Sequence, residues 1–155
     1  MDSPQNHIWG PNLWMILHSS AERIGNSQHH RLPHEETRLW SGLLNSLQYT
    51  LPCPVCKKHY AAYLISNPIV STNKEFIRNW LYKLHRDVNS RTGKPDIVPL
   101  DKIPEIYSQP FHFSAHFSIV NEQMLKAMRL GWMSRLDSMR TLRFLQEIKQ
   151  YYDFF

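Results

Sequence analysis

Apolar residues recur every three or four positions through most of the first 95 residues, which is the spacing of one face of an α-helix. Glycine and proline interrupt this pattern at Gly25, Pro52, Pro68 and Gly93. Because these residues end or break helices, the sequence predicts four helices joined by short links. No segment alternates as a strand would. We expect an all-α fold, a four-helix bundle with an additional C-terminal helical segment.

Several helix boundaries can be predicted from single residues. Pro11 suits the first position of the first helix. The second helix should end at Leu51, because the residue before a proline is pushed out of the helical region. A third helix should open at Cys53. Thr72 and Glu75 form a capping-box pair that predicts the start of the fourth helix.

The pattern changes after Pro95. Residues 96–118 are rich in proline and aromatic residues and predict irregular structure, whereas residues 121–151 regain helical spacing and predict one long helix. We therefore divide the chain into a core of residues 1–100 and an extension of residues 101–155. The extension should pack on the core or on a partner subunit.

Composition excludes several classes of protein. The chain has 155 residues, 42% of them hydrophobic, and a net charge of +5, which excludes intrinsic disorder and allows one packed core. No apolar stretch approaches the roughly 18 residues of a membrane-spanning helix. Two cysteines do not make the disulfide framework of a secreted protein. We expect a soluble intracellular protein with no membrane partner.

Both cysteines lie in one Cys-Pro-Val-Cys motif, at Cys53 and Cys56. Two intervening residues at a helix start allow a strained disulfide that exchanges readily. A helix N-terminus favours thiolate over thiol, which predicts a thiol pKa below the ordinary value of about 8.5. These residues favour redox chemistry, in which an incoming thiol reaches Cys53 first.

Other interpretations of this motif stay open at this point. A c-type haem site requires histidine directly after the second cysteine, where the chain has Lys57. Zinc could recruit Cys53, Cys56 and His59, but no second Cys or His pair completes a tetrahedron, so we expect no metal. A thioredoxin-like module would place the motif after a strand, and the flanks here are helical. Two buried cysteines without chemistry are the remaining alternative.

Three ordered motifs between residues 8 and 95 make the sequence similar to a known family. Residues 9–18 read WGPNLWMILH, residues 52–60 read PCPVCKKHY, and residues 80–95 read WLYKLHRDVNSRTGKP. They resemble the WGPxxWxxLH opening, the redox helix and the WxCxxHNxVNxxLGKP signature of the Erv/ALR family of FAD-linked sulfhydryl oxidases. The chain looks most like the minimal versions from large cytoplasmic DNA viruses.

The resemblance implies a helical bundle that holds FAD, usually as a homodimer, and oxidises thiols to disulfides while oxygen becomes hydrogen peroxide. Cys53 would be the distal cysteine, attacked by a substrate thiolate. Cys56 would be the proximal cysteine, released as a thiolate in charge-transfer contact with the flavin, which it attacks. The residues carried over as FAD-binding are Trp9, Gly10, Pro11, Trp14, His18, His59, His85, Val88, Asn89, Arg91, Lys94 and Tyr107.

Helical spacing agrees with several of these positions. Trp14 and His18 are four residues apart and share one helix face, as do His85 and Asn89. Two helices could thereby present rings and amides to the adenine and ribose. Arg91 and the nearby Lys94 are placed to meet the pyrophosphate charge.

The chain also departs from the family pattern. Two positions of a second family disulfide are Tyr82 and Pro99 here, and shuttle cysteines outside the core are missing. We therefore expect a thiol-containing protein to reach Cys53 directly, with a small thioredoxin-like dithiol carrier as the reductant and oxygen as the acceptor. If the protein is viral, we expect it in the host cytoplasm or the virion.

The alternative function is a basic helical protein that binds nucleic acid, or a structural zinc protein. From Pro110 onward the chain carries six basic and four acidic residues, a net charge of +2. This is a weak electrostatic match to a phosphate backbone, so we do not expect nucleic acid as a partner. The basic residues are Lys126, Arg129, Arg135, Arg140, Arg143 and Lys149.

Overall fold

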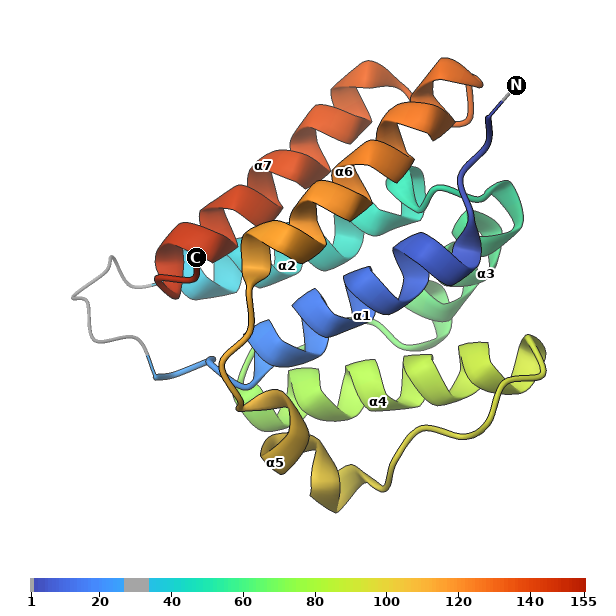
Figure 1. The fold of residues 1–155 in the computed structure, drawn as a ribbon. Coiled ribbons are helices and arrows are strands. Elements are labelled where there is room, and N and C mark those ends of the chain that lie inside the picture. Colours follow the sequence, from blue (N-terminus) through green and yellow to red (C-terminus); the bar gives the residue numbers. More distant parts are fainter. Residues whose placement is uncertain (1, 27–33) are drawn as a thin grey trace.

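The computed structural model describes residues 2–26 and 34–155, and the regular structure in these residues is entirely helical (Figure 1). This confirms the all-α prediction. None of the helices in these ranges combines the length and the apolar character needed to cross a bilayer. The helices are α1 (Asn6–Ala21), α2 (Glu35–Thr50), α3 (Pro54–Ser66), α4 (Lys74–Arg91), the short 3₁₀ helix η1 (Leu100–Lys102), α5 (Ile103–Tyr107), α6 (Phe113–Arg129) and α7 (Arg135–Tyr151).

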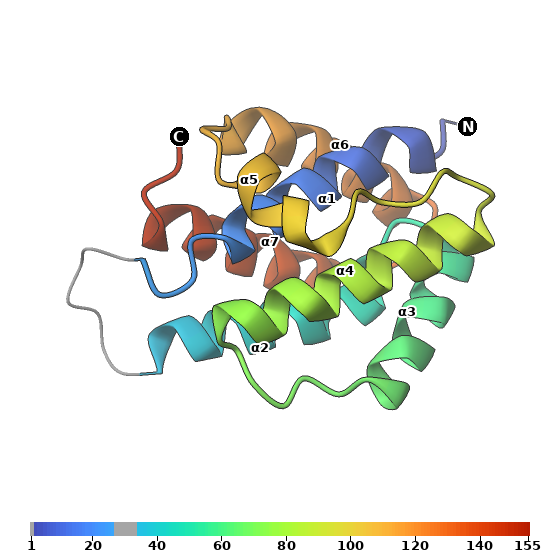
Figure 2. The same ribbon diagram turned by 90° about the horizontal axis from the view of Figure 1, so that it is seen from below.

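The middle of the molecule consists of α1 and α2, which lie between the antiparallel pair α6 and α7 on one side and α4 on the other (Figure 1). The helix α3 packs against α2, and the short α5 packs against α1. Seen from below, α4 crosses in front of α2, with α3 at one end (Figure 2). The first turn of α3 therefore lies at the end of the molecule where α1 begins and α4 ends.

One hydrophobic core runs through these helices. The apolar faces predicted for the first, second and fourth helices are buried, as the helical spacing requires. The same core includes side chains of α6 and α7, so these helices pack directly on α1 and α2. The division of the chain at residue 100 stays a prediction. Fully buried members of the core include Ile16, Trp40, Leu43, Leu44, Ile77, Leu81, Leu145 and Ile148.

The first helix begins earlier than Pro11, so the prediction of Pro11 at its first position was wrong. A full turn precedes the proline, because the Gln5 carbonyl accepts hydrogen bonds from the N–H groups of Ile8 and Trp9 at 2.9 and 3.0 Å. This extra turn buries Trp9. The apolar burial of a large ring offsets the hydrogen bond that the proline cannot donate.

The cap of α4 also differs from the prediction by one residue. Asn73 is the N-cap, and its Oδ1 accepts the N–H of Phe76 at 2.7 Å. The Thr72 hydroxyl instead lies 2.9 Å from that of Thr37, in α2. Asparagine is at least as good an N-cap as threonine. Because the Thr72 hydroxyl is engaged with Thr37, the adjacent Asn73 caps the helix instead.

The C-terminal segment forms two helices where one long helix was predicted. Gly131 has a φ of 77° and ends α6, and the N–H of Trp132 donates to the Ala127 carbonyl at 2.9 Å, as in a Schellman motif. Ser134 then caps α7 by accepting the N–H of Asp137 at 3.0 Å. In addition, α6 already begins inside the region 96–118 that was predicted to be irregular.

The contact of α7 with α2 depends on a close approach at Gly42. A Cβ placed on this residue would lie 2.2 Å from the ring of Phe144, so only glycine leaves room for that ring. One turn further along, the hydroxyls of Ser46 and Thr50 in α2 each lie 2.8 Å from that of Thr141 in α7, and all three are buried. The contact between α2 and α7 is therefore stabilised by the close fit at Gly42 and by buried hydroxyl groups that are hydrogen-bonded to one another.

Candidate functional site

The redox motif lies at a corner between two helices. Proline at position 52 follows the end of α2, and Pro54 is the first residue of α3. Cys53 lies between these helices with an extended backbone (φ −165°, ψ 119°) and is the N-cap of α3. Its Sγ accepts the N–H of Cys56 at 3.2 Å. Both cysteines are free and half-buried.

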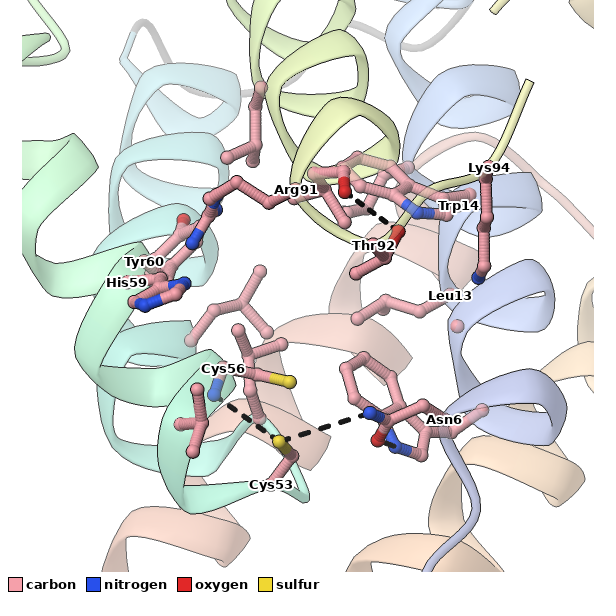
Figure 3. Close-up of a pocket in the computed structure, with 18 residues that line it drawn as sticks. Asn6, Leu13, Trp14, Cys53, Cys56, His59, Tyr60, Arg91, Thr92 and Lys94 are labelled. Atoms are coloured by element: carbon pink, nitrogen blue, oxygen red, sulfur yellow. Dashed lines mark hydrogen bonds between the residues drawn. The ribbon is translucent and has the colours of Figure 1, made fainter. Parts of the chain in front are cut away.

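A cavity of about 430 Å³ opens directly beside the two sulfurs. Its size falls within the roughly 300–1,000 Å³ range of cofactor and small-molecule pockets. The sulfur of Cys56 points into this cavity, whereas that of Cys53 lies at its edge beside Asn6 (Figure 3). The remaining lining residues come from α1, α2, α3 and the end of α4 with the loop after it.

The cavity wall is mostly apolar and aromatic, with two cationic side chains. Leucines of α1, α2 and α4 line it together with Trp9, Trp14 and Tyr60. Lys94 stands at the end away from the cysteines, whereas the Arg91 side chain extends from the end of α4 toward His59 and Tyr60 (Figure 3). The wall thus suits a flat apolar ring near the sulfurs and negative charge near the cations.

Seven of the twelve residues that the resemblance marks as FAD-binding line this cavity, and five do not. Pro11 is exposed on α1. Asn89 is buried and donates its Nδ2–H to the Pro95 carbonyl at 3.1 Å, so it holds the loop that carries Lys94. A direct role in binding FAD stays a prediction for all twelve. The seven lining residues are Trp9, Gly10, Trp14, His59, Val88, Arg91 and Lys94.

The other three residues form an aromatic stack that continues the cavity wall. The ring of Trp14 stacks on His85 with centroids 3.9 Å apart. Nε2 of His18 lies 2.9 Å from Nδ1 of His85, and the ring of Tyr107 stacks on His18 at 4.6 Å. The helices α1 and α4 and the short α5 thereby meet at one set of rings, as the shared helix faces predict.

Burial keeps both histidines of this stack neutral. Desolvation lowers the pKa of His18 to about 3, and the proximity of His85 adds to the shift. Desolvation also lowers the pKa of His85 to about 4, with a further contribution from Lys94. Nδ1 of His18 has no hydrogen-bond partner among the residues that the structure describes. A buried polar atom left unpaired costs about 1–3 kcal/mol, which a ligand polar atom would recover.

The electrostatics of Cys56 differ from the prediction. Burial, together with the adjacent Cys53, raises the pKa of its thiol to about 12, and a backbone hydrogen bond and, to a smaller extent, the charge of Arg91 act in the opposite direction. The prediction that the helix N-terminus would lower the pKa was wrong for this residue, because the apolar wall penalises the thiolate more than the helix favours it. The charge of Arg91 reduces this penalty only slightly.

Sequence reasoning missed several residues of the cavity. The leucines carried the periodic signal of a core, and nothing in that signal separates a packed face from a cavity wall. Tyr60 is fully buried and donates its O–H to the Leu44 carbonyl. Asn6 lies before the first recognised motif and carried no signal. The missed residues are Asn6, Leu13, Leu17, Leu47, Leu51, Val55, Tyr60, Leu84 and Thr92.

A thiol pair that opens on a cofactor-sized cavity in a helical bundle defines a thiol oxidoreductase that is built on helices alone. The chain belongs to the Erv1/Alr family, whose model matches residues 11–108. In the residues that the structure describes, no group of three His, Cys, Asp or Glu side chains is arranged to hold a metal ion.

Individual relatives agree with this assignment. The chain is 32% identical over 101 residues to the FAD-linked sulfhydryl oxidases of African swine fever virus isolates from Kenya and Malawi, which covers 65% of this chain and 81% of each viral protein. It is 26% identical over 99 residues to the mitochondrial FAD-linked sulfhydryl oxidase of Saccharomyces cerevisiae, which covers 61% of this chain and 48% of the yeast protein. No solved structure matches the chain significantly.

Proposed function

We propose that this chain is an FAD-dependent sulfhydryl oxidase that forms disulfides in protein substrates through Cys53 and Cys56. The observation that carries the proposal is the position of the Cys56 sulfur, which points into a cofactor-sized cavity while Cys53 stays at its edge. The family assignment and the names of the relatives support the same activity. Neither the nucleic-acid-binding alternative nor the zinc alternative has a supporting observation.

The residues of the cavity fit FAD. The aromatic wall at Trp9 and Trp14 suits the flat ring system, and Arg91 and Lys94 suit the pyrophosphate. The unpaired Nδ1 of His18 offers a buried polar contact next to this wall. When bound, FAD accepts two electrons from the thiol pair and transfers them to oxygen, which yields hydrogen peroxide.

The chain's own residues carry out thiol–disulfide exchange. In the oxidised pair, a substrate thiolate attacks the Cys53 sulfur, which is the sulfur at the cavity edge. The bond between Cys53 and Cys56 breaks, and the electron pair stays on Cys56. Burial makes this thiolate costly, and a backbone hydrogen bond and, to a smaller extent, the charge of Arg91 reduce that cost. A second substrate thiol then completes the substrate disulfide and leaves Cys53 reduced.

The substrate is a protein thiol that reaches Cys53 without an intermediate shuttle, since the chain contains two cysteines and both are in the redox motif. Next to Cys53, Val55 is 63% exposed and Pro54 is exposed. This exposed corner leaves room for the reactive thiol of a small dithiol carrier of the thioredoxin type. We propose such a carrier as the reductant and oxygen as the acceptor.

The assembly and location of the protein are part of the same proposal. We propose a homodimer, in which the extension of residues 101–155 packs against the core of residues 1–100 within each subunit. If the chain is viral, as the relatives from African swine fever virus suggest, we place it in the host cytoplasm or the virion.

The test is the activity of the purified chain and of two cysteine variants. The protein should carry bound flavin and consume oxygen when dithiothreitol is added, with release of hydrogen peroxide. Cys53→Ser and Cys56→Ser should each reduce turnover to background while flavin stays bound. A chain that binds no flavin, or a variant that keeps its turnover, contradicts the proposal.

A further inference from the structure

Asn6, the first residue of α1, lies beside the sulfur of Cys53 (Figure 3). Its Nδ2 is 4.0 Å from Cys53 Sγ, and its Oδ1 accepts the indole N–H of Trp9 at 3.0 Å. These two contacts connect the start of α1 to the redox corner between α2 and α3. Nothing in the sequence motifs pointed to this residue.

The contact with Trp9 determines which end of the Asn6 amide faces the sulfur. An indole nitrogen can only donate a hydrogen bond, so the atom of Asn6 that meets it must be the carbonyl oxygen. The amide nitrogen is therefore the atom directed at Cys53. Asn6 presents an N–H donor to this sulfur, and the buried ring of Trp9 holds that donor in place.

The Cys53 sulfur thus has two N–H donors, the backbone of Cys56 at 3.2 Å and the side chain of Asn6. We propose that Asn6 is a catalytic residue of the oxidase, which stabilises the negative charge on Cys53 when this sulfur leaves as a thiolate. The proposal rests on the function proposed above. Hydrogen bonds to a charged acceptor are about twice as strong as neutral ones, so the donor acts mainly on the thiolate.

The step concerned is the release of oxidised substrate. After the first exchange, the substrate is joined to Cys53 by a mixed disulfide. The second substrate thiolate attacks the substrate sulfur of this bond, so that the new disulfide forms within the substrate and the bond to Cys53 breaks. The electron pair of the broken bond stays on the Cys53 sulfur. The substrate has then lost two electrons, which the two cysteines hold, and the thiol protons go to solvent.

The test measures the Cys53 thiolate separately from turnover. In a Cys56→Ser chain, Cys53 is the one remaining thiol, and its alkylation by iodoacetamide can be followed from pH 6 to pH 10 by mass spectrometry. Asn6→Ala in this background should slow alkylation at pH 7 by about tenfold and move the pH profile upward by about one unit. Gln5→Ala is the matched control, because the adjacent Gln5 side chain bonds the Ser3 carbonyl and no sulfur.

A second variant keeps the test decisive if Asn6→Ala disturbs the start of α1. Trp9→Phe retains an apolar ring but removes the N–H that orients the amide, so it should slow alkylation by about threefold. In the chain with both cysteines, Asn6→Ala should lower the kcat of dithiol oxidation when the rate is expressed per bound flavin, which corrects for any loss of flavin from the cavity that Asn6 lines.

If Cys53 is alkylated as fast in the Asn6→Ala and Trp9→Phe variants as in the Gln5→Ala control, the proposed role of Asn6 is overturned. Failure of the proposed function has a different signature, because the unaltered chain would then bind no flavin and oxidise no thiol. The alkylation comparison decides on Asn6 in either case.

Discussion

Nε2 of His18 and Nδ1 of His85 lie 2.9 Å apart, so two imidazoles from α1 and α4 share one proton between them. This geometry requires at least one of the facing nitrogens to be unprotonated. Burial enforces that state by lowering both pKa values far below neutrality. The contact between the two helices is therefore coupled to pH.

The first prediction follows from these lowered pKa values. The unfolded chain protonates both histidines near pH 6.5, whereas the folded chain resists protonation of His85 down to about pH 4 and of His18 down to about pH 3. The unfolded state thus binds more protons as the pH falls below 6.5. The free energy of unfolding should drop by about 1.4 kcal/mol per pH unit for each histidine between pH 6.5 and pH 4.

Urea unfolding at pH 7, 6 and 5 measures this slope. The double variant His18→Phe with His85→Phe should show a clearly smaller slope, because both titrating rings are gone. His7→Gln, which removes an exposed histidine, should keep the slope of the unaltered chain. If the free energy of unfolding depends on pH with the same slope in all three proteins, His18 and His85 are not the source of that dependence.

The second prediction concerns Arg91 and the buried thiol of Cys56. Since Arg91 opposes the rise in the Cys56 pKa and is itself paired with Asp87, Arg91→Gln should slow alkylation of Cys56 in a Cys53→Ser chain by about two- to threefold at pH 9. Arg91→Lys retains the charge and is the matched control. The difference between the two variants should shrink in 0.5 M salt, and a difference independent of salt would argue for a steric effect instead.

The third prediction concerns the approach of α7 to α2. Gly42→Ala should destabilise the protein by about 1–3 kcal/mol, because the new methyl group overlaps the ring of Phe144. In a Phe144→Ala background the same change should instead stabilise by about 0.5–1 kcal/mol, since alanine is the better helix former. A double-mutant cycle by chemical unfolding gives the coupling, and the same sign in both backgrounds would show that the ring is not the obstacle.

The fourth prediction concerns the ion pair between α1 and α4. Glu22 is buried and accepts two hydrogen bonds from Arg78 at 2.7 and 2.8 Å. Glu22→Gln should lower the free energy of unfolding by about 3 kcal/mol, because it leaves a partly buried guanidinium without its counter-ion. The control is Asp96→Asn, which disrupts the well-exposed pair with Arg86 and should cost less than about 0.5 kcal/mol. Similar costs for the two variants would contradict this ranking.

The helices of the first 95 residues could be predicted because burial of a helix face leaves a periodic trace in the sequence. The start of α1 could not be predicted. The preference of proline for the first turn of a helix places the start at Pro11, whereas burial of Trp9 requires an earlier start, and the second effect appears only in the tertiary structure. The break between α6 and α7 was present in the sequence as Gly131 and Ser134. The helical spacing on both sides concealed it, since an antiparallel hairpin buries the same periodic positions.

The candidate site divides in the same way. The family resemblance predicted that Cys53, Cys56, Trp14 and Arg91 belong to one site, and all four line the cavity. The high pKa of Cys56 depends on how completely the surrounding helices exclude water, which no local pattern reports. The contact of Asn6 with Cys53 joins residues 47 positions apart and arises only from packing.

The N-cap position of Cys53 separates its chemistry from the helical scaffold. Its sulfur lies outside the repeating hydrogen bonds of α3, whereas its carbonyl accepts the Lys57 N–H at 3.0 Å as the first of them. The sulfur can thus exchange one covalent neighbour for another while every turn of the helix stays intact. Repeated catalytic cycles then cost the protein no local melting, and its far-ultraviolet circular dichroism should be the same before and after reduction.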